Sequence, residues 1–268
     1  MTAPRRVEVE VRDRVAYVRL TRPDKLNGLD FPMLDQLVDA ARGLRDDRSL
    51  RAAILLGDGP AFSSGLDFAS VSKQPARLAR AFVRLPWRPT NHFQRVCWEW
   101  RTLPIPVLAV LHGRCYGGAL QLALAADFRF ATPDCDLAVL EAKWGLVPDM
   151  TGTLTLRELV GADIAKRLTM TGETFDGRYA LRVGLVTGVA DDPLAEAERL
   201  VEQIITRSPD SVAASKALLN RTRSLGTRAA LRTERAIQLK LLRGDNSTIA
   251  RAAALAGKVA EYRPRARW

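Results

Sequence analysis

The chain has 268 residues, of which 47% are apolar and 26% are charged, and its mean hydropathy is −0.09. This composition is typical of a globular enzyme and excludes a disordered, collagen-like or disulfide-rich protein. Lysine and arginine outnumber aspartate and glutamate by 41 to 30, and this net charge of +11 indicates either a polyanionic ligand or arginine-rich solvated faces.

The beginning of the chain predicts strands that alternate with a helix. Valines at every second position over 7–11 are typical of a half-buried strand, and 15–20 is its predicted hairpin partner. Apolar residues at helical spacing predict a helix over 31–44. A short apolar strand over 52–56 and a glycine–proline turn over 57–60 follow. This order of elements favours an α/β protein.

The pattern then recurs. A basic, helical stretch over 74–100 precedes a strand over 107–111, and a glycine turn leads into an alanine- and leucine-rich helix over 119–126. Further short strands are predicted at 128–131, 137–139 and 185–189.

The last part of the chain predicts helices only, separated by proline or by Gly-Asp-Asn. These helices are expected over 193–207, 209–222, 227–242 and 247–262. The sequence therefore divides into an α/β part, residues 1–191, and a helical C-terminal region, residues 192–268.

Cysteine content and apolar runs indicate the compartment. Cys97, Cys115 and Cys135 are too few and too far apart for a disulfide framework or a zinc site. Residues 1–6 lack the apolar stretch of a secretory signal, and no apolar run approaches the roughly 20 residues of a membrane span. We expect a cytoplasmic protein that is not embedded in a membrane and has no metal site.

Few side chains suit the common kinds of catalysis. His92 and His112 are the only histidines, and no nucleophile-elbow, zinc-protease or phosphate-loop motif occurs. Two glycine-containing junctions remain, residues 63–67 and 113–119, where backbone N–H groups can approach a ligand. Two such donors on one oxygen form an oxyanion hole. Asp67 is expected to fix its own loop, and His112 to serve in packing.

Six segments, in order, resemble the crotonase superfamily, that is, the enoyl-CoA hydratase/isomerase family. They are Arg22–Asn27, Ala61–Asp67, Pro106–Gly113, Gly117–Ala123, Ala125–Arg129 and Gly145–Pro148. The resemblance implies an α/β fold: a crotonase-like spiral of β-β-α turns over 1–191, which holds the active site, then a helical trimerisation region. It also implies an acyl-CoA substrate, no permanently bound cofactor beyond the coenzyme A of that thioester, and a homotrimer or hexamer.

The resemblance assigns the oxyanion-hole N–H groups to the backbone of Leu66 and Gly118. In the family these donors hold the thioester carbonyl and stabilise an enolate, an effect of about 3–4 kcal/mol per donor. The resemblance also implies that coenzyme A lies near Lys25 and Leu26, and that the backbone of Ser64 and Leu66 binds its adenine.

The acid and base positions depart from the hydratase pattern. Family hydratases hold a water between two glutamates, which correspond to Gln121 and Glu141 here, and an amide can orient a water or substrate but cannot exchange protons. Asp149 stands where hydratases usually have glycine, and the dienoyl-CoA isomerases of the family have aspartate there. The resemblance therefore implies Glu141, Asp149 and Gln121 as catalytic candidates, although Asp149 is also placed to cap a helix.

These residues favour double-bond isomerisation of an enoyl- or dienoyl-CoA, in which Glu141 and Asp149 take and return a proton. Hydration of an enoyl-CoA by Glu141, with Gln121 positioning the water, is an alternative. A catalytically inactive CoA-binding homologue is another. Nucleic-acid binding by the basic surface, which includes the arginine- and tryptophan-rich stretch 71–103, is a further alternative.

Overall fold

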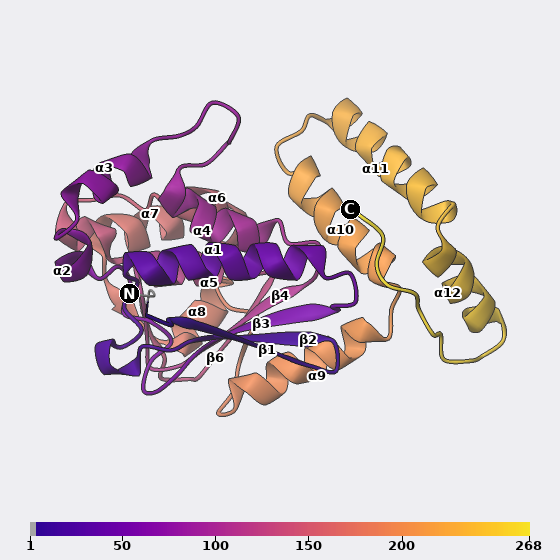
Figure 1. Ribbon diagram of the computed structural model, residues 1–268, viewed down its shortest axis with the longest axis horizontal. Helices are drawn as coiled ribbons and strands as arrows, with labels where there is room; N and C mark the ends of the chain where they lie inside the picture. Colours follow the sequence, from indigo (N-terminus) through magenta and orange to yellow (C-terminus); the bar gives the residue numbers. More distant parts are fainter. Residues whose placement is uncertain (1–3) are drawn as a thin grey trace.

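A six-stranded sheet forms the centre of the fold in the computed structural model, which describes residues 4–268 (Figure 1). The segment 1–6, in which no secretory signal is predicted, begins outside the described residues. In sheet order the strands are β1 (Val7–Arg12), β2 (Val15–Leu20), β3 (Ala52–Gly57), β4 (Val107–Leu111), β6 (Phe128–Ala131) and β9 (Gly188–Val189). The predicted hairpin β1–β2 is antiparallel, and all other neighbours in this sheet are parallel.

A second, three-stranded sheet lies at the ends of the central strands. It consists of β5 (Arg114–Tyr116), β7 (Asp136–Ala138) and β8 (Thr174–Phe175). Only His112 and Gly113 separate β4 from β5, so the chain passes from the first sheet to the second within one turn. The chain repeats this step from β6 to β7, which places the loops that follow parallel strands together.

Helices cover both faces of the central sheet (Figure 1). The larger core cluster includes residues of α1 (Phe31–Asp46), α4 (His92–Arg101) and α5 (Gly118–Ala125). The smaller cluster joins the opposite face of the sheet to α9 (Pro193–Ile205). Asp30 begins α1 as its N-cap, because its carboxylate accepts the Met33 N–H at 3.0 Å.

The predicted helical stretch over 74–100 is two helices. A short helix, α2 (Phe68–Val71), precedes α3 (Pro75–Phe82), and an exposed loop with two prolines separates α3 from α4. Asn91 and Gln94 form a capping box at the start of α4, so this helix has its own local start signal. Trp87 in the loop is 74% exposed.

Three helices between Met150 and Leu185 were not predicted. They are α6 (Gly152–Leu159), α7 (Ala162–Thr171) and α8 (Gly177–Val183), and two short 3-10 helices, η1 (Pro23–Lys25) and η2 (Leu140–Trp144), occur elsewhere. Glycines in the left-handed conformation end α7 and α8 after few turns, so neither helix develops a long apolar stripe. The strand predicted over 185–189 is shorter in the structure: β9 contains only Gly188 and Val189, because only these two residues pair with β6.

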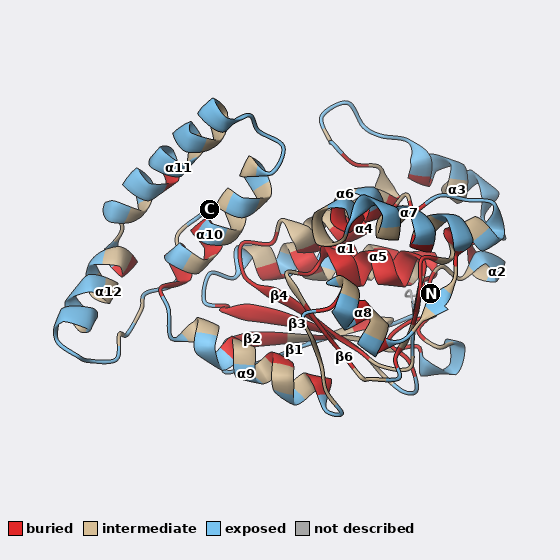
Figure 2. Cartoon of the chain, turned by 180° about the vertical axis from the view of Figure 1, so that it is seen from behind, coloured by how far each residue is buried: buried red, intermediate tan, exposed pale blue. Residues whose placement is uncertain are grey.

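The four predicted C-terminal helices are present: α9, α10 (Pro209–Thr222), α11 (Thr227–Leu242) and α12 (Asp245–Leu255). The prediction that the last one continues to residue 262 is wrong, because the chain folds back after α12 and the Ala266 N–H donates to Asp210 at 2.6 Å. We refer to α10–α12 as the arm, which projects from the core and is largely exposed (Figure 2). Since α9 packs on the sheet, the division at 191/192 stays a prediction.

None of the helices within residues 4–268 combines the length and apolar character that crossing a bilayer requires.

Candidate active site

The loop after β3 runs alongside β5. Ser63 and Cys115 form an isolated parallel bridge, and the Tyr116 N–H donates to the Ser63 carbonyl at 3.2 Å. Leu66 and Gly118 each lie three residues beyond this bridge. The parallel pairing therefore brings together the two backbone segments that the sequence assigns to the oxyanion hole.

Gly65 allows these two segments to approach closely. Its φ is +88°, and a Cβ atom added there would lie 2.6 Å from the Tyr116 carbonyl oxygen and 3.8 Å from the Gly118 nitrogen. Within residues 4–268, neither the Leu66 nor the Gly118 N–H donates a hydrogen bond to the protein. Two neighbouring amides without protein acceptors are the arrangement that stabilises a developing oxyanion.

The carboxyl group of Glu141 lies beside the same turn. A Cβ atom added at Gly117, whose φ is +50°, would lie 3.4 Å from Glu141 Oε1. Glu141 belongs to η2 and is 9% exposed. Met150 packs against the neighbouring Gly118, where an added Cβ atom would lie 2.7 Å from Met150 Sδ. The site therefore combines two free amides and one buried carboxyl group.

Gln121, on the buried helix α5, is 2% exposed and uses its amide group for contacts within the protein. Its carbonyl oxygen accepts the N–H groups of Met150 at 2.8 Å and Gly152 at 2.9 Å. Its Nε2 donates to Glu141 Oε1 at 2.5 Å. Glu141 Oε2, in contrast, is buried and has no hydrogen-bond partner within the described residues. Glu141 is thus held by one oxygen and free at the other.

Burial perturbs both carboxyl groups of the site. It raises the pKa of Glu141, and the negative charge of Asp149 adds to this effect, whereas hydrogen bonds from the Glu141 backbone and from Gln121 oppose it. Burial also raises the pKa of Asp149, against a hydrogen bond from its own backbone. Both groups therefore retain protons at a higher pH than free carboxylic acids, which suits proton transfer.

Asp149 lies half-buried in the turn between η2 and α6, and it faces a cavity of about 350 Å³. The cavity is lined by Pro89, Thr90, Gln94, Trp98, Pro148, Asp149, Thr151, Thr153 and Leu154. The alternative role of Asp149 as a helix cap is wrong, because Thr151 is the N-cap of α6 and no side chain caps that helix.

The residues expected near coenzyme A lie next to the loop of the two free amides. The Ser64 N–H donates to the Leu26 carbonyl at 2.8 Å, and Lys25 beside it is exposed. Asp67 fixes this loop, as expected: it caps α2 and accepts a hydrogen bond from Arg22 at 2.8 Å. Burial alone would raise the pKa of Asp67, but the hydrogen bonds that it accepts lower it.

Sequence reasoning missed the turn over 150–152. A Cβ atom at Gly152 would lie 2.6 Å from Gln121 Oε1, so only glycine allows this contact. Thr151 has φ +70°, which β-branched residues rarely adopt, and its buried hydroxyl oxygen has no regular hydrogen-bond partner within the described residues. The glycine was a visible signal, whereas no local pattern indicates the strained threonine.

Comparison with known proteins identifies the family. The model of the family described as enoyl-CoA hydratase/isomerase matches residues 10–253. The chain belongs to the enoyl-CoA hydratase/isomerase family.

Relatives of this family member include (E)-benzylidenesuccinyl-CoA hydratase of Thauera aromatica, which is 31% identical over 213 residues, or 78% of this chain and 80% of that protein. Crotonyl-CoA hydratase of Syntrophomonas wolfei is 30% identical over 215 residues, or 79% and 80% of the two chains. The crystal structure of a putative enoyl-CoA hydratase from Streptomyces coelicolor A3(2) matches with a TM-score of 0.87 at 32% identity and covers 98% of each chain.

These comparisons confirm the predicted crotonase resemblance and the α/β fold class of this family member. They also establish it as an enzyme of the acyl-CoA hydratase/isomerase family. The two relatives are named hydratases, so their names give no specific support to isomerisation.

Proposed function

We propose that the protein moves a double bond in the acyl group of an enoyl- or dienoyl-CoA. The observation that carries this proposal is the buried carboxyl group of Glu141 beside the turn of two amides without protein acceptors, with Asp149 close enough for its charge to act on Glu141. Burial raises the pKa of both carboxyl groups, and the negative charge of Asp149 disfavours ionisation of Glu141, so one group can act as a base while the other still carries a proton.

The proposed reaction has two proton transfers. With a 3-enoyl-CoA, the Glu141 carboxylate removes a proton from carbon 2, and the electron pair moves onto the thioester oxygen. The N–H groups of Leu66 and Gly118 stabilise the resulting enolate. Protonated Asp149 then delivers its proton to carbon 4, which forms the 2-enoyl-CoA and leaves no net change in atoms. Exchange with solvent returns Glu141 and Asp149 to their starting states.

Coenzyme A enters as part of the substrate, and the proposal includes no permanently bound cofactor. Lys25 contributes a positive charge for its phosphates, and Leu26 lies next to it. The backbone carbonyl groups of Ser64 and Leu66 supply acceptors for the adenine, since the Ser64 N–H donates to the Leu26 carbonyl and the Leu66 N–H is assigned to the thioester oxygen.

Hydration of a 2-enoyl-CoA is the second candidate, and the names of the two relatives favour it. In that reaction Glu141 activates a water and returns a proton to carbon 2. The Gln121 carbonyl already accepts two backbone N–H groups, so Glu141 and Asp149 are the groups that position the water.

Mass spectrometry separates the candidates. The protein is incubated with 2-enoyl-, 3-enoyl- and 3,5-dienoyl-CoA of medium chain length in heavy water, and the products are separated by chromatography. Isomerisation predicts altered retention and deuterium incorporation without added water from the 3-enoyl or dienoyl substrate. Addition of water to the 2-enoyl substrate, with no isomerised product, would overturn the first proposal in favour of hydration. Binding without any conversion would identify an inactive CoA-binding homologue.

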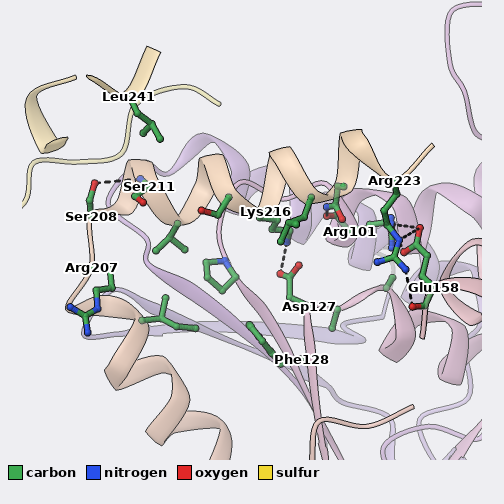
Figure 3. Close-up of a pocket in the computed structure, with 18 of the residues that line it drawn as sticks. Arg101, Asp127, Phe128, Glu158, Arg207, Ser208, Ser211, Lys216, Arg223 and Leu241 are labelled. Carbon is green, nitrogen blue, oxygen red and sulfur yellow. Dashed lines mark hydrogen bonds and ion pairs between the residues drawn. The ribbon is translucent and has the colours of Figure 1, made fainter. Parts of the chain in front are cut away.

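We further propose that 192–268 is the assembly region of a homotrimer or of a dimer of trimers. The arm exposes large apolar residues, including Leu219 at 67%, Leu239 at 53% and Leu255 at 91%. A cavity of about 830 Å³ lies between the arm and the core and is lined by residues of both (Figure 3). A second copy of the chain would cover such surfaces, which monomers rarely expose together.

Two ion pairs join the arm to the core, and Arg223, just after α10, lies 3.3 Å from the Glu158 carboxylate of α6. Lys216 of α10 lies 2.6 Å from the Asp127 carboxylate, and its ammonium group also donates to the Ile105 carbonyl at 2.9 Å (Figure 3). These contacts fix α10 to the core, whereas most of α11 and α12 is exposed and can contact another subunit.

A further inference from the structure

Gln121 connects three elements that carry the proposed chemistry. It lies on α5, it donates to Glu141 on η2, and it accepts from both sides of the turn that leads into α6. We infer that Gln121 is a positioning residue with two roles. Its N–H group binds Oε1 of Glu141 and so leaves Oε2 as the oxygen that exchanges the proton. Its carbonyl oxygen holds the turn that contains Asp149 and Thr151. The first part of this inference rests on the proposed role of Glu141 as acid and base.

The donor side of the amide orients Glu141. Nε2 is engaged with Oε1 at 2.5 Å, and the buried Oε2 has no partner within residues 4–268. An amide donates whether Glu141 is ionised or protonated, because it does not exchange its own protons. Oε2 is therefore the oxygen that takes and gives the proton in every state of the cycle.

The acceptor side clamps the turn. The Gln121 carbonyl oxygen binds the N–H groups of Met150 and Gly152, which flank Thr151 on either side. Thr151 has φ +70° and ψ 5°, a left-handed conformation that disfavours β-branched residues. Such strain persists only where the surroundings fix the backbone, and two hydrogen bonds to one buried oxygen provide this constraint.

A carboxylate at position 121 would serve only the acceptor side. One oxygen would still accept from the turn, but the other would face Glu141 Oε1, where two acceptors need a shared proton. Asp149 is the other charged group close to Glu141, and the nearby Cys97 thiol is neutral because burial raises its pKa. The amide thus serves both contacts without adding a second negative charge.

Gln121→Glu tests the donor side, because it keeps the acceptor for the turn. We expect the pH at half-maximal kcat/KM on the acid side to rise by about one unit or more, since the two carboxyl groups share a proton. Gln203→Glu, an exposed position on α9, makes the same charge change and is expected to leave this midpoint in place. An unchanged midpoint in Gln121→Glu overturns the donor role.

Infrared titration provides a readout that does not depend on turnover. The carboxylic-acid band of Glu141 is assigned by subtracting the spectrum of Glu141→Gln, and its midpoint is expected to rise in Gln121→Glu. If no acyl-CoA is converted, the proposed function fails, and the infrared midpoint still decides whether Gln121 controls Glu141. An unshifted band overturns this control.

A double-mutant cycle tests the clamp. Gln121→Met leaves the N–H groups of Met150 and Gly152 unpaired and is expected to lower the Tm. Thr151→Gly adopts the left-handed conformation without strain, so it is expected to recover part of that loss in the double variant. Strictly additive changes in Tm would show that Gln121 does not hold Thr151 and would overturn the clamp.

Discussion

Helices α5 and α11 are opposites in the same chain. All eight residues of α5 are buried, whereas Ile237 is the only buried residue among the sixteen of α11 (Figure 2). In α5 the exceptional residue is polar, and Gln121 is tied to the candidate site because a buried amide must be hydrogen-bonded. In α11 the exceptional residues are apolar, and Leu231 and Leu239 are exposed. The buried polar group thus indicates chemistry, and the exposed apolar groups indicate a partner.

The strongest test of the proposed catalytic role of the buried site is Glu141→Gln. This change keeps the size of the side chain but removes its ability to exchange protons, so we expect kcat to fall by about 10²–10⁴-fold. Titration calorimetry with a saturated acyl-CoA is expected to give an unchanged Kd. The matched control is Glu202→Gln, at an exposed position on α9. Activity within tenfold of the unmodified enzyme would remove Glu141 from the mechanism.

Gly65→Ala tests the close approach of the two amide-bearing segments. The new Cβ atom would lie 2.6 Å from a backbone oxygen at a residue with φ +88°, so we expect the free energy of unfolding to fall by about 2–3 kcal/mol. Gly43→Ala, in an open and exposed part of α1, is expected to raise it by about 0.5–1 kcal/mol. Chemical denaturation measures both, and equal effects would contradict the proposed constraint.

Leu255→Glu tests whether the exposed apolar residues of the arm contact another subunit. Leu255 is 91% exposed at the end of α12, so a charge there is expected to leave the fold intact and to reduce the assembled mass toward that of one chain. Sedimentation velocity measures this mass. Met170→Glu, at a 73% exposed position on α7 of the core, is the control and is expected to leave the assembly unchanged. An unaltered assembly in Leu255→Glu would exclude this end of the arm from the interface.

The smallest expected effect is a shift in the titration midpoint of Glu141, measured from its carboxylic-acid infrared band. Glu141 must lose its proton to act as a base, and burial raises its pKa, so activity is expected to appear only above the ordinary pKa of a glutamate. Asp149→Asn removes a negative charge that raises this pKa and is expected to lower the midpoint of the Glu141 carboxylic-acid infrared band by about half a unit, whereas turnover is lost because Asp149 is the proposed proton donor. Asp163→Asn, exposed on α7, is the control. An equal midpoint in the unmodified protein, Asp149→Asn and Asp163→Asn would contradict the electrostatic coupling between Asp149 and Glu141.

The sequence was informative where local pattern and motif agree. The hairpin, the parallel strands and the start of α1 follow from alternation, apolar runs and an aspartate cap. Its glycines also indicated both segments of the candidate oxyanion hole. The contacts of Gln121 were not predictable, because its partners lie 20 to 31 residues away and are brought together only by tertiary folding.

The end of α12 illustrates the other limit of sequence reasoning. A helix was predicted over 247–262, but Gly257 adopts the left-handed conformation, with φ +62°, and the Lys258 N–H donates to the Ala253 carbonyl at 2.9 Å, which ends the helix. The tail beyond α12 packs back onto the chain, where Arg265 is 2% exposed and donates to the Arg45 carbonyl. The prediction of a longer helix therefore overlooked a local stop signal, and the packing of the tail could not be read from the sequence.

The buried pair of Lys216 and Asp127 restricts how this protein can evolve. Lys216 has a side chain only 9% exposed, and replacing Asp127 alone would leave its charge without a counter-ion. Removing one partner of such a pair costs about 3–5 kcal/mol, whereas replacing both by well-packed apolar residues is often neutral. We therefore expect positions 127 and 216 to change together among descendants of this sequence. A substitution at one codon would be retained by selection only with a matching substitution at the other.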